Sequence, residues 1–106
     1  MEARQRTGLF FLEALKSAAY HVYIVECADG TYYTGSTNDL ENRLKKHNSG
    51  AGAKYLRGRG PVRVVYLRRC RSKSSALKFE AKIKALDRSK KMEIIKMHQM
   101  ISEENQ

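Results

Sequence analysis

Hydrophobic and polar residues alternate along two short stretches of the chain that are separated by a turn-forming tripeptide. Residues 21–27 (HVYIVEC) are rich in β-branched and aromatic side chains, and residues 31–34 (TYYT) resume the pattern. Ala28-Asp29-Gly30, which lies between them, has the composition of a hairpin turn. The pattern therefore predicts a β-hairpin.

The length of this turn decides which side chains of the hairpin share a face. A three-residue loop that ends at a left-handed Gly30 pairs Val25 with Tyr33. Side chains alternate along a strand, so Tyr23 then lies on the same face as Tyr33. A two-residue loop would pair Glu26 with Tyr33 and would place the two tyrosines on opposite faces. Only the three-residue loop brings both phenols into one site.

Beyond the hairpin, apolar residues recur at helical spacing in three segments and fill one further strand. The predicted elements are a helix capped by Thr37 or Asn38 that begins near Asp39 and ends by Gly50, a strand over 62–70, a helix from Ser74 or Ser75 to about Leu86, and a last helix from Ser89. The positions expected to face the core are Ala76, Leu77, Phe79, Ile83 and Leu86 in the second helix and Met92, Ile95 and Met100 in the last. The order predicts an α/β domain of the α+β kind, a small three-stranded antiparallel sheet flanked by helices in the order β-β-α-β-α-α.

A chain of 106 residues is long enough for one domain with a modest core. We expect this domain to cover residues 20–101, with a frayed tail over 102–106. Residues 1–19 are expected to form a helical appendage, a candidate for contact with a protein partner, because helical spacing is followed by Leu9, Leu12, Leu15 and Ala19. No apolar run approaches the roughly 20 residues that cross a bilayer, so no membrane association is expected.

Positive charge is concentrated in the second half of the chain. The whole chain carries +10, whereas the 18 basic and 3 acidic residues between Arg43 and Lys96 give that stretch +15 and leave −5 for the rest. Such a field indicates an anionic polymer as partner, with nucleic acid, DNA or RNA, ahead of an acidic membrane. The alternative is a highly soluble basic surface with no dedicated ligand. Cys27 and Cys70 lack disulfide-framework or zinc-site spacing, so free thiols and an intracellular location, cytoplasmic or at a bacterial nucleoid, are expected.

A glycine-rich basic segment, residues 48–61 (NSGAGAKYLRGRGP), follows the first helix. Lys54, Arg57 and Arg59 supply charge for phosphates, and Tyr55 supplies a ring that can stack on a base. We therefore expect this segment to bind nucleic acid. The alternative is a connector whose charges only keep it solvated.

Three polar residues are predicted to lie beside apolar stripes. Arg43 and His47 are one helical turn apart and can reach a shared groove. Glu80 lies within the apolar arc of its helix, where a carboxylate is costly unless it is paired, hydrogen-bonded or bound to a metal. Two structural alternatives stay open: an ion pair of Glu80, for example with Arg43, and a His47 that is satisfied at the edge of the core.

Taken in order, these residues resemble the GIY-YIG nuclease family. Tyr23-Ile24-Val25 stands in the first signature and Tyr33-Thr34-Gly35 in the second, and the match continues through Thr37, Leu40, Arg43, His47 and GAKYLRGRGP to Glu80. The resemblance covers about residues 20–90 and is greatest to the short, single-domain bacterial branch related to the catalytic subunits of structure-specific endonucleases. It implies a small antiparallel sheet flanked by helices.

The resemblance also implies a role for each residue of the set. Tyr23 would accept a proton from water, Tyr33 would position water or phosphate, and His47 would orient or relay to a tyrosine. Arg43 would stabilise the charged phosphate, and Glu80 would bind one divalent metal ion, Mg²⁺ or Mn²⁺.

The expected function is a metal-dependent endonuclease that hydrolyses phosphodiester bonds in DNA by single-strand incision, selected by shape or structure. The rival expectations are a non-catalytic nucleic-acid-binding module and a subunit that a partner recruits through residues 1–19.

Overall fold

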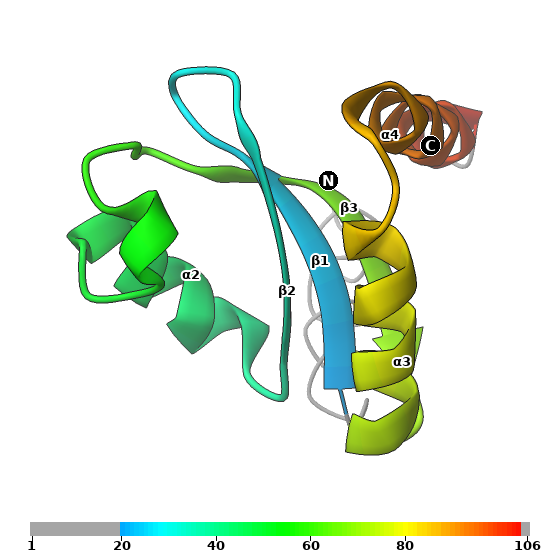
Figure 1. The fold of residues 1–106 in the computed structure, drawn as a ribbon, viewed down its shortest axis with the longest axis horizontal. Coiled ribbons are helices and arrows are strands. Elements are labelled where there is room, and N and C mark those ends of the chain that lie inside the picture. The colour runs from blue at the N-terminus through cyan, green and yellow to red at the C-terminus, as the bar shows by residue number, and fades with distance from the viewer. Residues whose placement is uncertain (1–19, 105–106) are drawn as a thin grey trace, which may run out of the picture.

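The described part of the chain folds into a three-stranded antiparallel sheet and three α-helices. The computed structural model describes residues 20–104, and the helix expected within residues 1–19 lies outside that range. The elements are β1 Tyr20–Glu26, β2 Tyr32–Thr37, α2 Leu40–Ser49, the 3₁₀-helix η1 Lys54–Leu56, β3 Arg63–Cys70, α3 Lys73–Lys84 and α4 Arg88–Glu104. The strands are ordered β2-β1-β3 (Figure 1). The predicted class and element order are confirmed.

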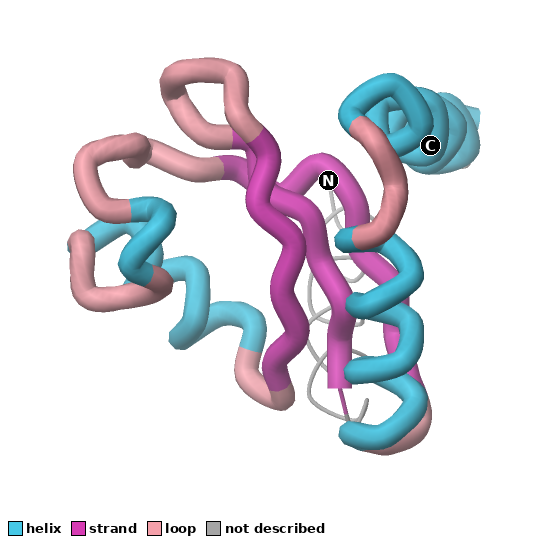
Figure 2. The backbone as a smooth tube through the Cα atoms, in the orientation of Figure 1, coloured by secondary structure: helices cyan, strands magenta, loops and turns pink. Residues whose placement is uncertain are grey.

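Helices cover both faces of the sheet, with α2 on one side and α3 on the other (Figures 1 and 2). Because side chains alternate along β1, the strand supplies both layers. On the α2 side the buried cluster comprises Tyr23, Val25, Cys27, Leu40, Leu56 and Val62. On the α3 side it comprises Ile24, Val65, Ile83 and Ile95. Among the described strands β2 lies at an edge, so residues from both layers can meet there.

The hairpin turn has the three-residue form. Val25 pairs with Tyr33, and Gly30 has a left-handed φ of 85°, which costs glycine little because it has no Cβ. The Gly30 amide donates to the Cys27 carbonyl at 2.9 Å, and the Cys27 amide donates to the Thr31 carbonyl at 2.8 Å. Of the two registers that the sequence left open, the structure has the one that a three-residue loop gives, and Tyr23 and Tyr33 share the α2 face.

The helix starts differ from those predicted. Asp39 caps α2, since its carboxylate accepts from the Asn42 amide at 3.2 Å, whereas the Thr37 hydroxyl accepts from the Asp39 amide one step earlier. Ser72 caps α3 in a reciprocal capping box with Ser75. Serine and aspartate clusters offer several chemically equivalent caps, and the backbone path from the preceding strand selects among them.

The predicted apolar arcs were too wide. Ile83 and Ile95 are buried as expected, but Leu77, Met92 and Met100 are 50%, 48% and 51% exposed. A helix that lies on one face of a small sheet buries only a narrow stripe. Helix α4 also continues to Glu104, beyond residue 101, where we expected the domain to end.

Candidate active site

A buried tyrosine–histidine pair lies between the sheet and α2. The Tyr23 hydroxyl and His47 Nε2 are 2.9 Å apart, and each residue is 1% exposed. The Ala53 amide donates to His47 Nδ1 at 3.4 Å, so this nitrogen is the acceptor and Nε2 carries the hydrogen. His47 therefore donates to the Tyr23 oxygen, and the phenolic hydrogen of Tyr23 is left for another acceptor.

Two glycines permit this pair to pack. Gly35 is the cross-strand partner of Tyr23, and a Cβ at Gly35 would lie 2.5 Å from the Tyr23 hydroxyl. A Cβ at Gly52 would lie 2.9 Å from the Cα of His47. The last residue of Tyr33-Thr34-Gly35 is thus required by the ring that lies over it.

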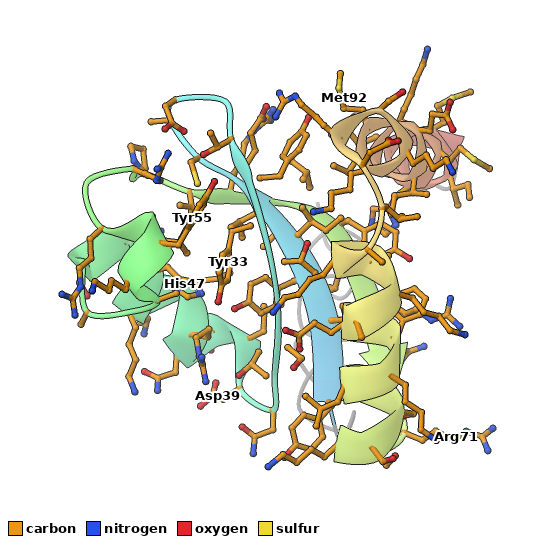
Figure 3. All side chains as sticks on the ribbon, viewed as in Figure 1. Tyr33, Asp39, His47, Tyr55, Arg71 and Met92 are labelled. Atoms are coloured by element: carbon orange, nitrogen blue, oxygen red, sulfur yellow. The ribbon has the colours of Figure 1, made fainter. Side chains whose placement is uncertain are left out.

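Tyr33 links the pair to the basic segment. Its ring meets the His47 ring edge-on at a centroid distance of 5.7 Å and stacks on the Tyr55 ring at 5.8 Å. Figure 3 shows these three side chains together between α2 and the sheet, far from Arg71 and Met92. Tyr33 is half-buried, unlike Tyr23, so its phenol is the more accessible of the two.

Arg43 is exposed one turn before His47 and forms no ion pair with any side chain described between residues 20 and 101. Burial lowers the pKa of His47, and the positive charge of Arg43 lowers it further. His47 is thus held neutral, in keeping with its single Nε2 hydrogen. The guanidinium remains available for an external anion.

Glu80 reaches the site from the opposite face. Its side chain is 14% exposed, its Oε1 accepts from the Ser36 hydroxyl at 2.5 Å, and its Oε2 lies 2.7 Å from Lys84 Nζ. Burial alone would raise the pKa of Glu80, but the hydrogen bonds from Lys84 and Ser36 outweigh it and leave the pKa below its ordinary value. Glu80 is therefore ionised, and its ion pair is with Lys84 rather than Arg43.

The Tyr23–His47 pair and the Glu80 carboxylate approach each other at the β2 edge. Gly35 lies under Tyr23 on the α2 side, and the next residue, Ser36, holds Glu80 on the α3 side. Burial raises the pKa of Tyr23. The neighbouring Tyr33 and Glu80 raise this pKa further, whereas Arg43 lowers it, so all three groups lie within electrostatic range of the Tyr23 hydroxyl. The structure thus places the tyrosines, Arg43 and His47 on one face and brings Glu80 to them around the edge strand.

The donor set at Glu80 suits a hard divalent cation. Carboxylate and hydroxyl oxygens of Glu80 and Ser36 lie together, and the Lys84 ammonium already occupies a cation position on Glu80. Among the side chains described between residues 20 and 101, no group of three or more His, Cys, Asp or Glu residues could enclose a metal ion. Mg²⁺ commonly keeps several waters and uses one or two protein carboxylates, so a single glutamate fits it.

The four residues predicted to bind nucleic acid divide into two pairs. Lys54 and Arg57 are exposed and form no ion pair within the described chain. Arg59 is engaged: its guanidinium lies 2.6 Å from Asp29 and 4.5 Å from the Tyr55 ring centre. Tyr55 also stacks on Tyr33, so Tyr55 and Arg59 tie the segment to the hairpin.

The sequence reasoning missed the supporting residues Gly35, Ser36, Gly52 and Lys84. The four-residue spacing from Glu80 to Lys84 is a signal for an ion pair. The glycine of the second tyrosine tripeptide signals a close approach. Ser36 and Gly52 carry no such signal, since their contacts depend on the register of β2 and on the path of a loop.

Comparisons with known proteins agree with this geometry. The family model described as the GIY-YIG catalytic domain matches residues 19–93. UPF0213 protein BH0048 of Halalkalibacterium halodurans is 49% identical over 78 residues, 74% of this chain and 83% of that protein. UPF0213 protein VNG_2274C of Halobacterium salinarum is 51% identical over 72 residues, 68% of this chain and 94% of that protein.

Two solved structures share the fold. The NMR structure of BH0048 has a TM-score of 0.50 and covers 74% of this chain and 83% of its own. The NMR structure of EF2693 from E. faecalis is 38% identical, has a TM-score of 0.55, and covers 80% of this chain and 90% of its own. None of the described helices is long and apolar enough to span a membrane. With the family model matching most of its length, the chain belongs to the GIY-YIG family.

Proposed function

We propose that this protein is a metal-dependent endonuclease that hydrolyses phosphodiester bonds in DNA. GIY-YIG domains are generally endonucleases, so nuclease activity is the general expectation for a member of this family. The observation that carries the proposal is the meeting of two unlike groups at the β2 edge: a hydrogen-bonded phenol and imidazole on one face, and a part-buried, ionised carboxylate on the other. The phenol and the imidazole lie within electrostatic range of the Arg43 guanidinium, which has no ion-pair partner among the described residues.

Arg43 is the residue proposed to bind the phosphate at which cleavage occurs. A guanidinium presents a fixed fork of donors that matches two phosphate oxygens and stabilises the charge that builds up in the transition state. Arg43 is exposed and has no competing carboxylate within the described residues. The substrate phosphate would therefore lie over the first turns of α2, next to the tyrosine pair.

Tyr23 is proposed to accept the proton of the attacking water. Two features favour its ionised form: His47 donates a hydrogen to its oxygen, and Arg43 places positive charge nearby. Burial, the neighbouring Tyr33 and the negative charge of Glu80 oppose ionisation and together keep the pKa of Tyr23 above its ordinary value in the free protein. Because Tyr23 is 1% exposed, bound substrate must also open a path to its hydroxyl.

Glu80 is proposed to hold the single divalent cation, with Ser36 fixing the carboxylate orientation. When bound, such an ion would neutralise phosphate oxygens and replace the negative field of Glu80 with a positive one, which favours the Tyr23 phenolate. Tyr33, the half-buried phenol beside His47, is proposed to position water or phosphate.

The substrate is proposed to be DNA recognised by shape and charge, with incision of one strand. The positive charge between Arg43 and Lys96 and the exposed Lys54 and Arg57 support contact with a phosphate backbone. Backbone contacts position a protein without reading bases. A domain of this size has little surface for direct base readout, so structure selectivity is the expected behaviour.

The test is cleavage of end-labelled duplex, single-stranded, flap and branched DNA in Mg²⁺, in Mn²⁺ and in EDTA. We expect Glu80→Gln to abolish the metal-dependent cleavage. We expect Arg43→Ala to lower the cleavage rate about 100- to 1,000-fold, the range found when one preorganised donor to a transition state is removed. Glu41→Gln is the matched control, because Glu41 also pairs with the lysine four residues later but is exposed on α2.

The outcomes separate the enzyme from a binding module. Cleavage by the wild type and the Glu41 variant, together with loss in the Glu80 variant, supports the enzyme. If the wild type binds DNA tightly yet cuts none of the four substrates with either metal, the protein is a non-catalytic nucleic-acid-binding module. Cleavage that appears only when a protein bound to residues 1–19 is added would identify a recruited subunit.

A further inference from the structure

The partner of Glu80 is a lysine that occupies the place where a divalent cation would bind. Lys84 Nζ lies 2.7 Å from Oε2, the carboxylate oxygen that Ser36 does not use. We propose that Lys84 is a substrate-binding residue, held on Glu80 in the free protein and transferred to a DNA phosphate when a divalent cation takes its place. This inference rests on the proposed nuclease function.

The pair is asymmetric, which makes the lysine the member that moves. The Glu80 side chain is 14% exposed and fixed at Oε1 by Ser36, whereas the Lys84 side chain is 54% exposed. A lysine carries its charge on a flexible four-carbon stem. The ammonium can therefore leave while the carboxylate stays in position to receive another cation.

A second pair in the same chain shows what an ordinary lysine–glutamate contact looks like. Glu41 and Lys45 have the same four-residue spacing on α2, but their charged groups are 3.9 Å apart and their side chains are 67% and 75% exposed. Such exposed helix pairs contribute little. The pair formed by Glu80 and Lys84 is shorter, has one buried member, and lies at the proposed catalytic edge.

A Lys84 side chain that leaves Glu80 would stay close to the site of the proposed cleavage. The Tyr33 phenol is within electrostatic range of the Lys84 ammonium, and Tyr33 lies against His47. A lysine released from Glu80 would thus remain beside the phenol proposed to position the phosphate. An ammonium is a compact point charge that binds phosphate oxygens without strict geometry.

The first consequence is competition for Glu80. Removing the Lys84 charge deletes a cation that a divalent ion must displace, so Lys84→Met should raise affinity for Mn²⁺. We expect an increase of about threefold to tenfold, the range for one partly exposed neighbouring charge. Binding is measured from the loss of the free Mn²⁺ signal in electron paramagnetic resonance, and Glu80→Gln identifies the signal that belongs to this site.

The second consequence is a metal-dependent contribution to DNA binding. With EDTA the lysine stays on Glu80, so Lys84→Met should change the affinity for a fluorescent duplex less than twofold. This is about the effect expected when any single surface charge is removed. With Ca²⁺, under conditions where the DNA is shown to stay intact, we expect the same change to weaken binding about threefold to tenfold. Lys84→Gln should behave in the same way.

Two control variants remove a lysine without touching Glu80. Lys45→Met removes the lysine of the exposed pair, and Lys82→Met removes an exposed charge from α3 itself. Each should leave Mn²⁺ affinity within twofold of wild type. Each should also weaken DNA binding equally with EDTA and with Ca²⁺.

The inference is overturned if Lys84→Met leaves Mn²⁺ affinity unchanged or lowers it, or if the loss of DNA affinity is the same with and without Ca²⁺. Wild-type cleavage together with either result leaves the proposed function standing. If instead Glu80→Gln binds Mn²⁺ as well as the wild type, the metal site fails, and the inference fails with it.

Discussion

Replacing Gly35 with alanine tests whether the second tyrosine tripeptide ends in glycine because of the ring above it. Gly35 is not among the glycines with positive φ, so its backbone suits alanine. The objection is steric: the new Cβ would lie 2.5 Å from the Tyr23 hydroxyl and 2.7 Å from its Cζ. We expect Gly35→Ala to destabilise the fold and to separate Tyr23 from His47.

The size of the effect follows from three terms. Carbon atoms pack best at about 3.5–4.0 Å, so the alanine methyl is about 1 Å too close to Tyr23. Adding a group to a filled core costs about 1–3 kcal/mol, and losing the hydrogen bond to His47 adds about 0.5–1.5 kcal/mol. The lower entropy of the unfolded alanine chain offsets about 0.4–1 kcal/mol. The free energy of unfolding should fall by about 2 kcal/mol, within the range of about 0.5–4 kcal/mol that these terms allow.

Urea denaturation followed by far-ultraviolet circular dichroism measures this change. With a urea m-value of about 1 kcal/mol/M for a small domain, the midpoint should fall by about 2 M. The same substitution is then made in Tyr23→Leu, which lacks the end of the ring that the methyl meets. In that background the cost of Gly35→Ala should shrink to less than about 0.5 kcal/mol, because contacting residues are energetically coupled.

Two results would refute the steric argument. One is a Gly35→Ala protein as stable as the wild type, which would mean that the ring moves aside at no cost. The other is an equal loss of stability with Tyr23 and with Leu at that position. An equal loss would assign the glycine requirement to the backbone of β2 rather than to the ring.

Three further predictions concern the groups around this contact. Burial lowers the pKa of His47 in the folded protein, so the stability linked to its neutral form is complete above about pH 6.5 and is lost as the pH falls through the folded-state pKa. When urea unfolding is measured at pH 7.5 and at pH 5.0, His47→Gln should therefore lose less stability between the two pH values than the wild type. Changing Lys54 and Arg57 together to alanine should weaken binding to all DNA sequences alike and lower the slope of log affinity against log salt by about 1–2, measured by fluorescence anisotropy, whereas a sequence-selective loss would contradict a backbone role. Asp29→Asn should weaken the 2.6 Å contact to Arg59 and, because the pair is exposed, change global stability little. It should raise amide hydrogen exchange in the segment after α2; unchanged exchange would mean that the contact does not hold that segment.

The fold was largely predictable because local patterns specify it. Alternating residues set the strands, and the turn Ala28-Asp29-Gly30 fixed the register that unites Tyr23 with Tyr33. The errors arose where several residues were locally equivalent, as at the Asp39 cap, or where helical periodicity did not reveal how wide a stripe the sheet would cover, as at Met92.

The sequence suggested which residues could form the candidate site but not how they are arranged. Helical spacing correctly indicated that Glu80 lies on the packed side of α3, yet it could not show that the carboxylate reaches Ser36 of the edge strand β2. Tyr55 and Arg59 have the composition of nucleic-acid contacts, but tertiary contacts with Tyr33 and Asp29 engage them within the protein. Such contacts depend on segments distant in sequence, so local patterns do not encode them.

The position of β2 has a consequence for solubility as well as for chemistry. Among the described strands, β2 pairs with β1 alone, and its outer backbone groups could template a strand from another molecule. Charged side chains beside such an edge are a usual defence against that pairing. Glu80 accepts a hydrogen bond from Ser36 of β2, and Lys84 pairs with Glu80, so two charged side chains lie beside this edge. Substitutions that neutralise them would also weaken this defence. Variants at Glu80 or Lys84 should therefore be compared with the wild type at low concentration, where self-association does not imitate a loss of function.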